Sequence, residues 1–172
     1  MERLPRRSFG AAEVRKVLSY CPISGQFVWA VRVQCFGGGR AVGSHAGTIK
    51  DGYVEITLYG RRYRAHHLAW LLMTGEWPPI DSDMDHRNGV RADNSWDNLR
   101  LATRTQNNAN ARRRERSSTG IRGVYRTRGR FFARVVSEGQ IHHLGVFDSI
   151  EAAAAARNRA ARRLFGEFFR AA

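Results

Sequence analysis

The sequence predicts an α+β protein built from two small modules. The chain is only 172 residues long, its periodic apolar segments are short, and strand-like and helix-like spacings follow one another. An apolar fraction of 42% is enough for modest cores and too high for a wholly disordered chain. We expect a lead-in segment at 1–48, a first module at 49–111, a basic linker at 112–119 and a second module at 120–172.

Turn signals and hydrophobic spacing define the elements of the first half. Residues 9–19 predict a short helix and residues 26–30 a short strand. Residues 53–58 alternate between apolar and polar and, with residues 62–65, predict a hairpin. Leucines at helical spacing predict a helix over 66–74, which the following proline pair is expected to end.

Two polar segments complete this half. Five glycines between residues 36 and 47 predict a loop, and no Lys-Ser/Thr follows them to make a phosphate cradle. Residues 80–86 predict a short strand-like stretch, followed by a loop with Asn-Gly and Asp-Asn turn signals. The stretch 98–102 then leads into a polar helix that contains Asn107.

The last 53 residues predict three strands followed by one helix. The strand-like runs are 121–126, 131–137 and 141–147, separated by Arg-Gly and Glu-Gly turns. Ser149 is expected to cap an alanine-rich helix over 151–165. On the second strand, the alternation directs Arg130, Phe132 and Arg134 to one face and Phe131, Ala133 and Val135 toward the helix.

Positive charge is concentrated in one part of the chain. The net charge is +14, and 27 of the 29 basic residues are arginine. Residues 1–99 contribute +3 and residues 135–172 contribute +1, whereas residues 100–134 contribute +10. An almost acid-free block of this kind favours binding to a polyanion, and nucleic acid is the first candidate for that partner. The choice of arginine fits bidentate phosphate contacts and also fits high-GC codon usage.

Composition excludes several other classes. The sequence has no run of 18 apolar residues and no apolar segment behind the basic N-terminus, so neither a membrane span nor a secretory signal is expected. Cys21 and Cys35 alone provide neither a disulfide framework nor a four-ligand zinc site. We therefore expect a soluble intracellular protein.

One polar constellation has a specific spacing. Asp85-His86 is followed after eleven residues by Asn98 and after eight more by Asn107. Together with the His-Arg-Asn-Gly, Asp-Asn and Asn-Leu-Arg motifs of this segment, the spacing resembles the HNH endonucleases, the ββα-metal nucleases, in the form found in phage homing endonucleases. The resemblance covers most of residues 12–111. In its phage form it implies a cytoplasmic protein of a bacterial or phage-infected cell, associated with the nucleoid.

This resemblance implies a role for each residue of the constellation. His86 would be the general base and Asn98 would orient it through its side-chain carbonyl. Asp85 and Asn107 would hold one divalent ion, and their hard oxygen atoms suit Mg²⁺ or Mn²⁺ better than zinc. The family name expects histidine at position 107, and Asn108 fits the spacing less well. His66 resembles a family position near the site, where we expect it to support the site rather than to catalyse.

The second module resembles another family. Its Gly-Ile-Arg-Gly-Val-Tyr-Arg, Arg-Phe-Phe-Ala-Arg-Val and His-His-Leu-Gly-Val-Phe segments are similar to the plant ethylene-response-factor DNA-binding domain over residues 120–168. That family lays a three-stranded sheet into the major groove, although the tryptophan of its first hairpin is missing here. The positions matched to it are Arg122, Tyr125, Arg126, Arg130, Arg134 and His143. The charge block adds Arg100, Arg104, Arg112, Arg113, Arg114 and Arg128 as expected DNA contacts.

These expectations describe a metal-dependent HNH DNA endonuclease of homing type. It would hydrolyse phosphodiester bonds in double-stranded DNA, with His86 as base, a divalent metal ion and no obligate protein partner. A catalytically inactive DNA-binding or regulatory protein on the same fold is the main alternative. An RNA-binding protein is a second alternative, and the sequence lacks the aromatic stacking motifs of single-strand RNA modules.

Overall fold

The chain folds into two compact units, each with its own sheets and helices. A computed structural model describes residues 8–35, 38–110 and 118–169. The N-terminal unit is Met1–Ala102 and the C-terminal unit is Thr103–Ala172. Most of the predicted basic linker lies outside the described residues.

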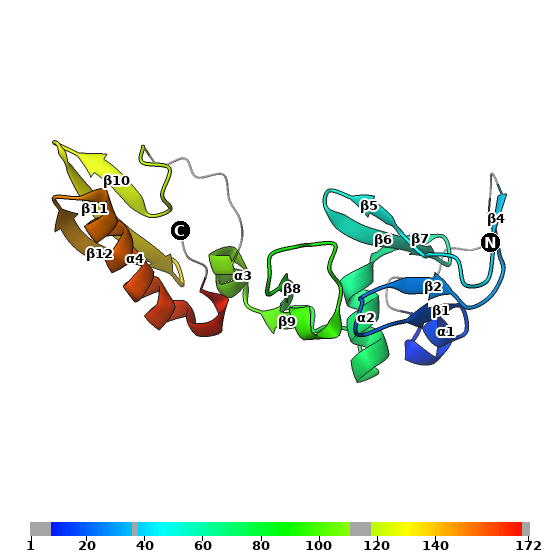
Figure 1. Cartoon of the computed structure of the whole chain (residues 1–172). Coiled ribbons are helices and arrows are strands. Elements are labelled where there is room, and N and C mark those ends of the chain that lie inside the picture. Colours follow the sequence, from blue (N-terminus) through cyan, green and yellow to red (C-terminus); the bar gives the residue numbers. More distant parts are fainter. Residues whose placement is uncertain (1–7, 36–37, 111–117, 170–172) are drawn as a thin grey trace. The chain divides into compact units, whose positions relative to one another are not determined.

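Small antiparallel sheets and two helices make up the described part of the N-terminal unit (Figure 1). The elements before the second helix are α1 (Ala11–Arg15), β1 (Leu18–Tyr20), β2 (Phe27–Trp29), β3 (Val33–Cys35), β4 (Gly38–Arg40), β5 (Thr48–Lys50), β6 (Tyr53–Leu58) and β7 (Arg61–Arg64). They are followed by α2 (Ala65–Thr74), β8 (Asp83–His86), the 3₁₀ turn η1 (Trp96–Asn98) and β9 (Leu99–Ala102). The predicted hairpin and the second helix are confirmed.

Two local expectations for this unit were wrong. The predicted helix 9–19 ends at Arg15, because Leu18 pairs with Trp29 in the β1–β2 hairpin and both side chains are buried there. The glycine-rich loop contains strand β4, paired with β3. Helix α2 ends at Thr74, as predicted, but Gly75 ends it rather than the proline pair, because its φ of 84° is a left-handed conformation that favours glycine.

Apolar side chains from α2 and the small sheets form one core. Phe27, Ile56, Leu68 and Leu71 are essentially inaccessible to solvent, and they come from three different elements. Helix α2 turns its buried side toward the β5–β6–β7 sheet, so residues of β6 and α2 meet in this core. The core fixes the elements that flank the β8–β9 hairpin.

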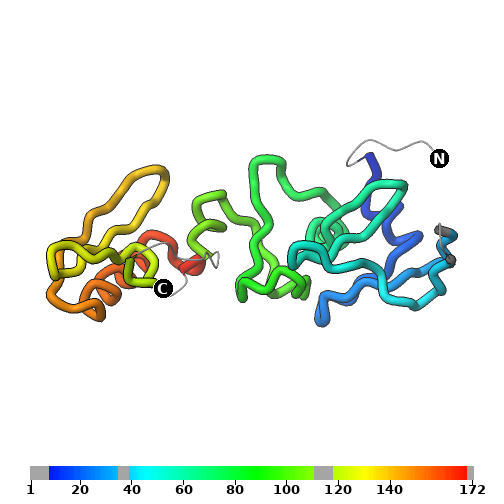
Figure 2. Tube along the Cα trace, turned by 90° about the horizontal axis from the view of Figure 1, so that it is seen from above, coloured from blue at the N-terminus to red at the C-terminus, as the bar shows by residue number. Residues whose placement is uncertain are grey.

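The two strands β8 and β9 position the polar constellation. They pair antiparallel, with Asp85 opposite Arg100 and His86 opposite Leu99. The chain leaves β8, passes through a polar loop and the turn η1, and returns directly as β9 (Figure 2). Because the pair is short, the side chains of both strands lie close to the loop that connects them.

The C-terminal unit has a three-stranded antiparallel sheet with one long helix against it (Figure 1). Its elements are α3 (Arg104–Asn110), β10 (Val124–Thr127), β11 (Arg130–Ser137), β12 (Gln140–Phe147), α4 (Ile150–Phe165) and the 3₁₀ turn η2 (Gly166–Phe168). The predicted order of three strands and a helix is confirmed, as is the cap in which Ser149 Oγ accepts from the backbone of Ala152 at 3.1 Å.

The short helix α3 was expected in the first module and groups with the second. The guanidinium of Arg122 donates to the carbonyl oxygens of Asn108 and Ala109, both at 2.9 Å. These two bonds join Arg122 to carbonyl oxygens in the last turn of α3. Within the described parts of both units, no helix is long and apolar enough to cross a membrane.

Candidate active site

A buried ion pair occupies the middle of the β8–β9 hairpin. Arg100 donates through Nε to Asp85 Oδ2 at 2.8 Å, and its Nη2 lies 2.7 Å from the same oxygen. The two side chains are only 6% and 5% exposed. The prediction that Arg100 contacts DNA is therefore wrong in this structure, because its guanidinium is buried against Asp85, its partner across the hairpin.

His86, the predicted base, contacts Asn94 in the connecting loop. Its Nε2 lies 3.3 Å from Asn94 Oδ1. The Asn94 amide is oriented by its own nitrogen, which donates to the carbonyl of Ala92 at 3.2 Å. Oδ1 can only accept, so Nε2 must carry the proton, and in the neutral ring the lone pair is on Nδ1.

Burial keeps the His86 ring neutral. Burial lowers the pKa of His86 below the usual 6.5, while the hydrogen bond to Asn94 and the nearby Asp85 and Asp93 raise this pKa, and Arg91 lowers it. Desolvation prevails because the ring is almost fully buried. A histidine that is neutral near pH 7 can accept a proton, as a general base requires.

The lead-in segment holds Asn94 in place. Tyr20 donates its hydroxyl to the Asn94 carbonyl at 2.7 Å, and burial raises the pKa of Tyr20 to about 12, so the hydroxyl stays protonated. Gly25 has a φ of 70°, and a Cβ there would overlap the backbone of Asn94 and Ser95. The turn between β1 and β2 therefore packs directly against the loop beside His86.

Asn98 holds the loop instead of the histidine. Its Oδ1 accepts from the backbone of Asn88 at 2.9 Å, and its Nδ2 donates to the carbonyl of Asp93 at 2.7 Å. The expectation that Asn98 orients His86 through its carbonyl is wrong here, because both ends of the amide are engaged by loop backbone. Asn94 is the asparagine at the His86 ring.

A cluster of rings surrounds His86 on its other side. The His66 ring centroid lies 5.1 Å from that of His86 and 4.5 Å from that of His67. Tyr53 lies 5.5 Å from His66, and the Arg64 guanidinium stands 4.0 Å above the Tyr53 ring. Burial, followed by His67, His86 and Arg64, lowers the pKa of His66 well below its usual value. A neutral, buried His66 beside the base is consistent with the predicted supporting role.

The two residues predicted to be metal ligands belong to different units. Asp85 is buried in the N-terminal unit, whereas Asn107 is half-buried on α3 of the C-terminal unit, where its backbone donates to Thr103. In the described residues, no group of three His, Cys, Asp or Glu side chains could hold a metal ion. By donor chemistry, a carboxylate and a carboxamide still fit a hard divalent ion that keeps several water ligands.

The C-terminal sheet carries an aromatic row on the face away from α4. The rings of Tyr125 and Phe132 stack at 5.2 Å, and those of Phe132 and His143 at 6.1 Å. Arg134 lies 4.8 Å from the Tyr125 ring and donates to its hydroxyl at 3.3 Å. With Arg130 these residues form a surface that we call the sheet face.

The other predicted DNA contacts occupy different positions. Arg104 and Arg128 are exposed, on α3 and on the first turn of the sheet. Arg126 is exposed but lies on the α4 side of the sheet, near the Phe131 ring. Arg122 is half-buried and bonded to α3, and its contact with DNA stays a prediction. The linker arginines Arg112, Arg113 and Arg114 lie outside the described residues.

Two comparisons with known proteins find similarity to HNH endonucleases. A family model described as HNH endonuclease matches residues 63–109, which run from β7 through the β8–β9 hairpin into α3. The match supports an HNH endonuclease domain in this segment, on a mixed α and β scaffold with small antiparallel sheets.

One curated relative extends the similarity beyond that segment. An uncharacterized HNH endonuclease of Acanthamoeba polyphaga mimivirus is 32% identical over 120 residues, which is 69% of this chain and 62% of that protein. The chain therefore spans less than two thirds of the length of this relative. No solved structure matches the chain. The comparisons point to a nuclease.

Proposed function

We propose that the protein is a metal-dependent DNA endonuclease of homing type, in which the N-terminal unit cuts and the C-terminal unit binds double-stranded DNA. The observation that carries this proposal is the pairing of a buried, neutral His86 with Asn94, next to the buried carboxylate of Asp85. A base held in one tautomer and an acid on the adjacent strand residue are the groups that phosphodiester hydrolysis needs.

His86 takes the proton from the attacking water at Nδ1. The Asn94 carbonyl fixes Nε2–H, so that Nδ1 keeps its lone pair and the ring keeps one orientation. His66 and Tyr53 restrict the ring from the other side. General base catalysis of this kind contributes about 10²–10⁴ in rate.

Asp85, with Asn107, is proposed to hold the divalent ion, and Mg²⁺ is the expected metal. When bound, such an ion stabilises negative charge on the scissile phosphate and the leaving oxygen. Arg100 keeps the Asp85 carboxylate at a fixed angle and offsets its burial. Asn107 as second ligand remains a prediction from the sequence.

The C-terminal unit is proposed to hold the duplex through the sheet face, as the resemblance to the ethylene-response-factor domain predicts. Arg134 and Arg130 supply positive charge, and the ring row of Tyr125, Phe132 and His143 supplies an apolar surface between them. The ion pair of Arg130 with Asp148 is exposed, so a phosphate can replace the carboxylate at little cost.

Nicking of supercoiled plasmid tests the proposal. With the full chain we expect conversion to open-circular DNA in Mg²⁺ or Mn²⁺ and none in EDTA. Tight binding of the plasmid without conversion in either metal would instead support the binding-only alternative. Competition with RNA of equal length separates a DNA partner from an RNA partner.

A further inference from the structure

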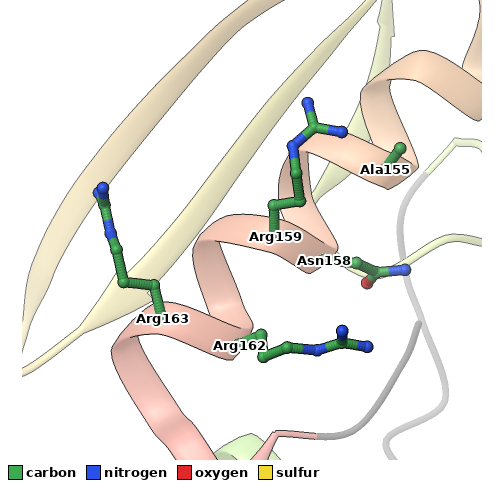
Figure 3. Close-up of a pocket in the computed structure, with 5 residues that line it drawn as sticks. All are labelled: Ala155, Asn158, Arg159, Arg162 and Arg163. Carbon is green, nitrogen blue, oxygen red and sulfur yellow. The ribbon is translucent and has the colours of Figure 1, made fainter.

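The outer surface of helix α4 carries a group of arginines without an assigned role. Arg159, Arg162 and Arg163 are exposed and, with Ala155 and Asn158, line a hollow of about 400 Å³ (Figure 3). We call these three arginines the helix face.

Helix geometry directs the helix face away from the sheet. The buried residues of α4 are Ala153, Arg157, Ala161 and Phe165, spaced by four, and they form the stripe that packs on the sheet. At about 100° per residue, the three arginines fall on the side opposite to this stripe. The helix face and the sheet face therefore lie on opposite sides of the C-terminal unit.

The charges of the helix face are not neutralised within the described residues. Neither Arg159 nor Arg163 has a carboxylate partner there, and the Arg162 guanidinium lies 5.2 Å from the centroid of the Phe169 ring. Spacings of three and four residues place these like charges as neighbours on the helix, which destabilises it slightly. For Arg162 and Arg163, which lie in the last turn, a favourable interaction with the helix dipole can offset this repulsion. Arg159 lies too far from that end to gain the same interaction.

We propose that the helix face binds the phosphate backbone of a second segment of double-stranded DNA. Guanidinium groups at successive turns match a row of phosphates in charge and in bidentate geometry. One straight duplex cannot touch two opposite faces of a small unit, so a duplex on the sheet face leaves the helix face to another. The inference rests on the proposed function, because it takes the sheet face as the first DNA site.

Energy transfer between two labelled duplexes tests directly whether one chain binds both of them. The full chain is mixed in EDTA, which prevents cutting, with 20-bp duplexes labelled either with a donor or with an acceptor dye. We expect transfer with the wild-type chain. The variant Arg159→Gln/Arg162→Gln/Arg163→Gln should bind one duplex within about threefold of the wild-type affinity and lose the transfer. Because all three residues are exposed, its thermal unfolding should be unchanged.

A charge-matched variant separates a specific face from net charge. Arg32→Gln/Arg40→Gln/Arg62→Gln removes the same charge from exposed positions of the N-terminal unit and should keep the transfer. The slope of log affinity against log salt for the second duplex should fall by about three in the helix-face variant and stay unchanged in the charge-matched variant.

The possible failures are distinguishable. The inference is overturned if the helix-face variant shows as much energy transfer as the charge-matched variant. It is also overturned if the wild-type chain binds one duplex but never two. A wild-type chain that binds no duplex overturns the proposed function and this inference together.

Discussion

Arg100 and Arg130 each pair with an aspartate, in opposite surroundings. The Arg100–Asp85 pair is 6% and 5% exposed, whereas the Arg130–Asp148 pair, at 2.6 Å, is 53% and 87% exposed. A buried pair is fixed, because either charge left alone would be costly, whereas an exposed pair can exchange its partner. The comparison shows how the units differ: the N-terminal unit fixes its polar groups around a site, and the C-terminal unit leaves its cations available for a ligand.

The largest expected effect is on the chemistry of the N-terminal unit. His86→Ala should reduce the nicking rate by about 10²–10⁴, because the base is lost, while DNA affinity should stay within about twofold. Initial rates of plasmid nicking and a gel-shift titration measure the two quantities. Equal losses of rate and affinity would remove His86 from the role of base.

Breaking the two ion pairs tests the comparison itself. Arg100→Ala should lower the free energy of unfolding by about 3–5 kcal/mol, because it removes the cation that is paired with a buried carboxylate. Arg130→Ala, the matched change in the exposed pair, should cost less than about 1 kcal/mol. Urea unfolding of both variants gives these values. Similar small costs would show that the Asp85 carboxylate is solvated.

The pH dependence of nicking should reflect the burial of His86. Because burial lowers its pKa below the usual 6.5, the acid limb of the rate should have its midpoint below pH 6.5. Removing the hydrogen bond in Asn94→Ala takes away an interaction that raises this pKa, so the falling limb should move further toward acid. A limb centred above pH 6.5 would contradict a buried neutral base.

The same burial makes folding sensitive to acid. His66 and His86 have lower pKa values when folded than when unfolded, so the unfolded chain binds more protons below pH 6.5. Their contribution is fully present above pH 6.5 and is lost as the pH falls toward the folded pKa values. Thermal melting of wild-type and His66→Gln between pH 7.5 and 5.5 should show a smaller acid loss in the variant.

The smallest expected effect concerns the sheet face. Arg134→Gln should reduce the slope of log affinity against log salt by about one, the value for one phosphate contact. Arg126→Gln, on the same sheet but on the α4 side, should leave the slope nearly unchanged. Equal slope changes for the two variants would mean that the duplex does not select one face of the sheet.

Local signals in the sequence predicted much of the fold. Ser149 marks the start of α4 because capping depends on neighbouring residues only. The β6–β7 hairpin and the strand run at Asp85-His86 follow from turn residues and alternation. The end of the first helix was missed because Leu18 follows tertiary pairing with Trp29 rather than its helical spacing.

Contacts between distant residues could not be predicted in the same way. The contact of Asn94 with His86 depends on a loop that Tyr20 and Gly25 hold from about 70 positions earlier in the chain. The Asp-Asn pair at 93–94 was visible as a turn signal, but nothing in the sequence distinguished it from Asn98. Arg100 is buried because the strand register places it opposite Asp85. Its positive charge indicates an exposed side chain instead, so the sequence did not predict this burial.

The helix face was missed because charge was summed along the chain. Residues 135–172 have a net charge of only +1, since four acidic residues in that segment offset four of its five arginines. The fold separates these charges in space and leaves three arginines on one side of the helix.

The division of work between the two units is tested most directly by single-turnover nicking at saturating protein. The account predicts that Arg134→Gln, measured at concentrations that overcome its weaker binding, reaches the wild-type rate, whereas His86→Ala stays at least about 10²-fold slower at any concentration. A His86→Ala chain that reaches the wild-type rate, or an Arg134→Gln chain that stays slow when fully bound, would contradict it.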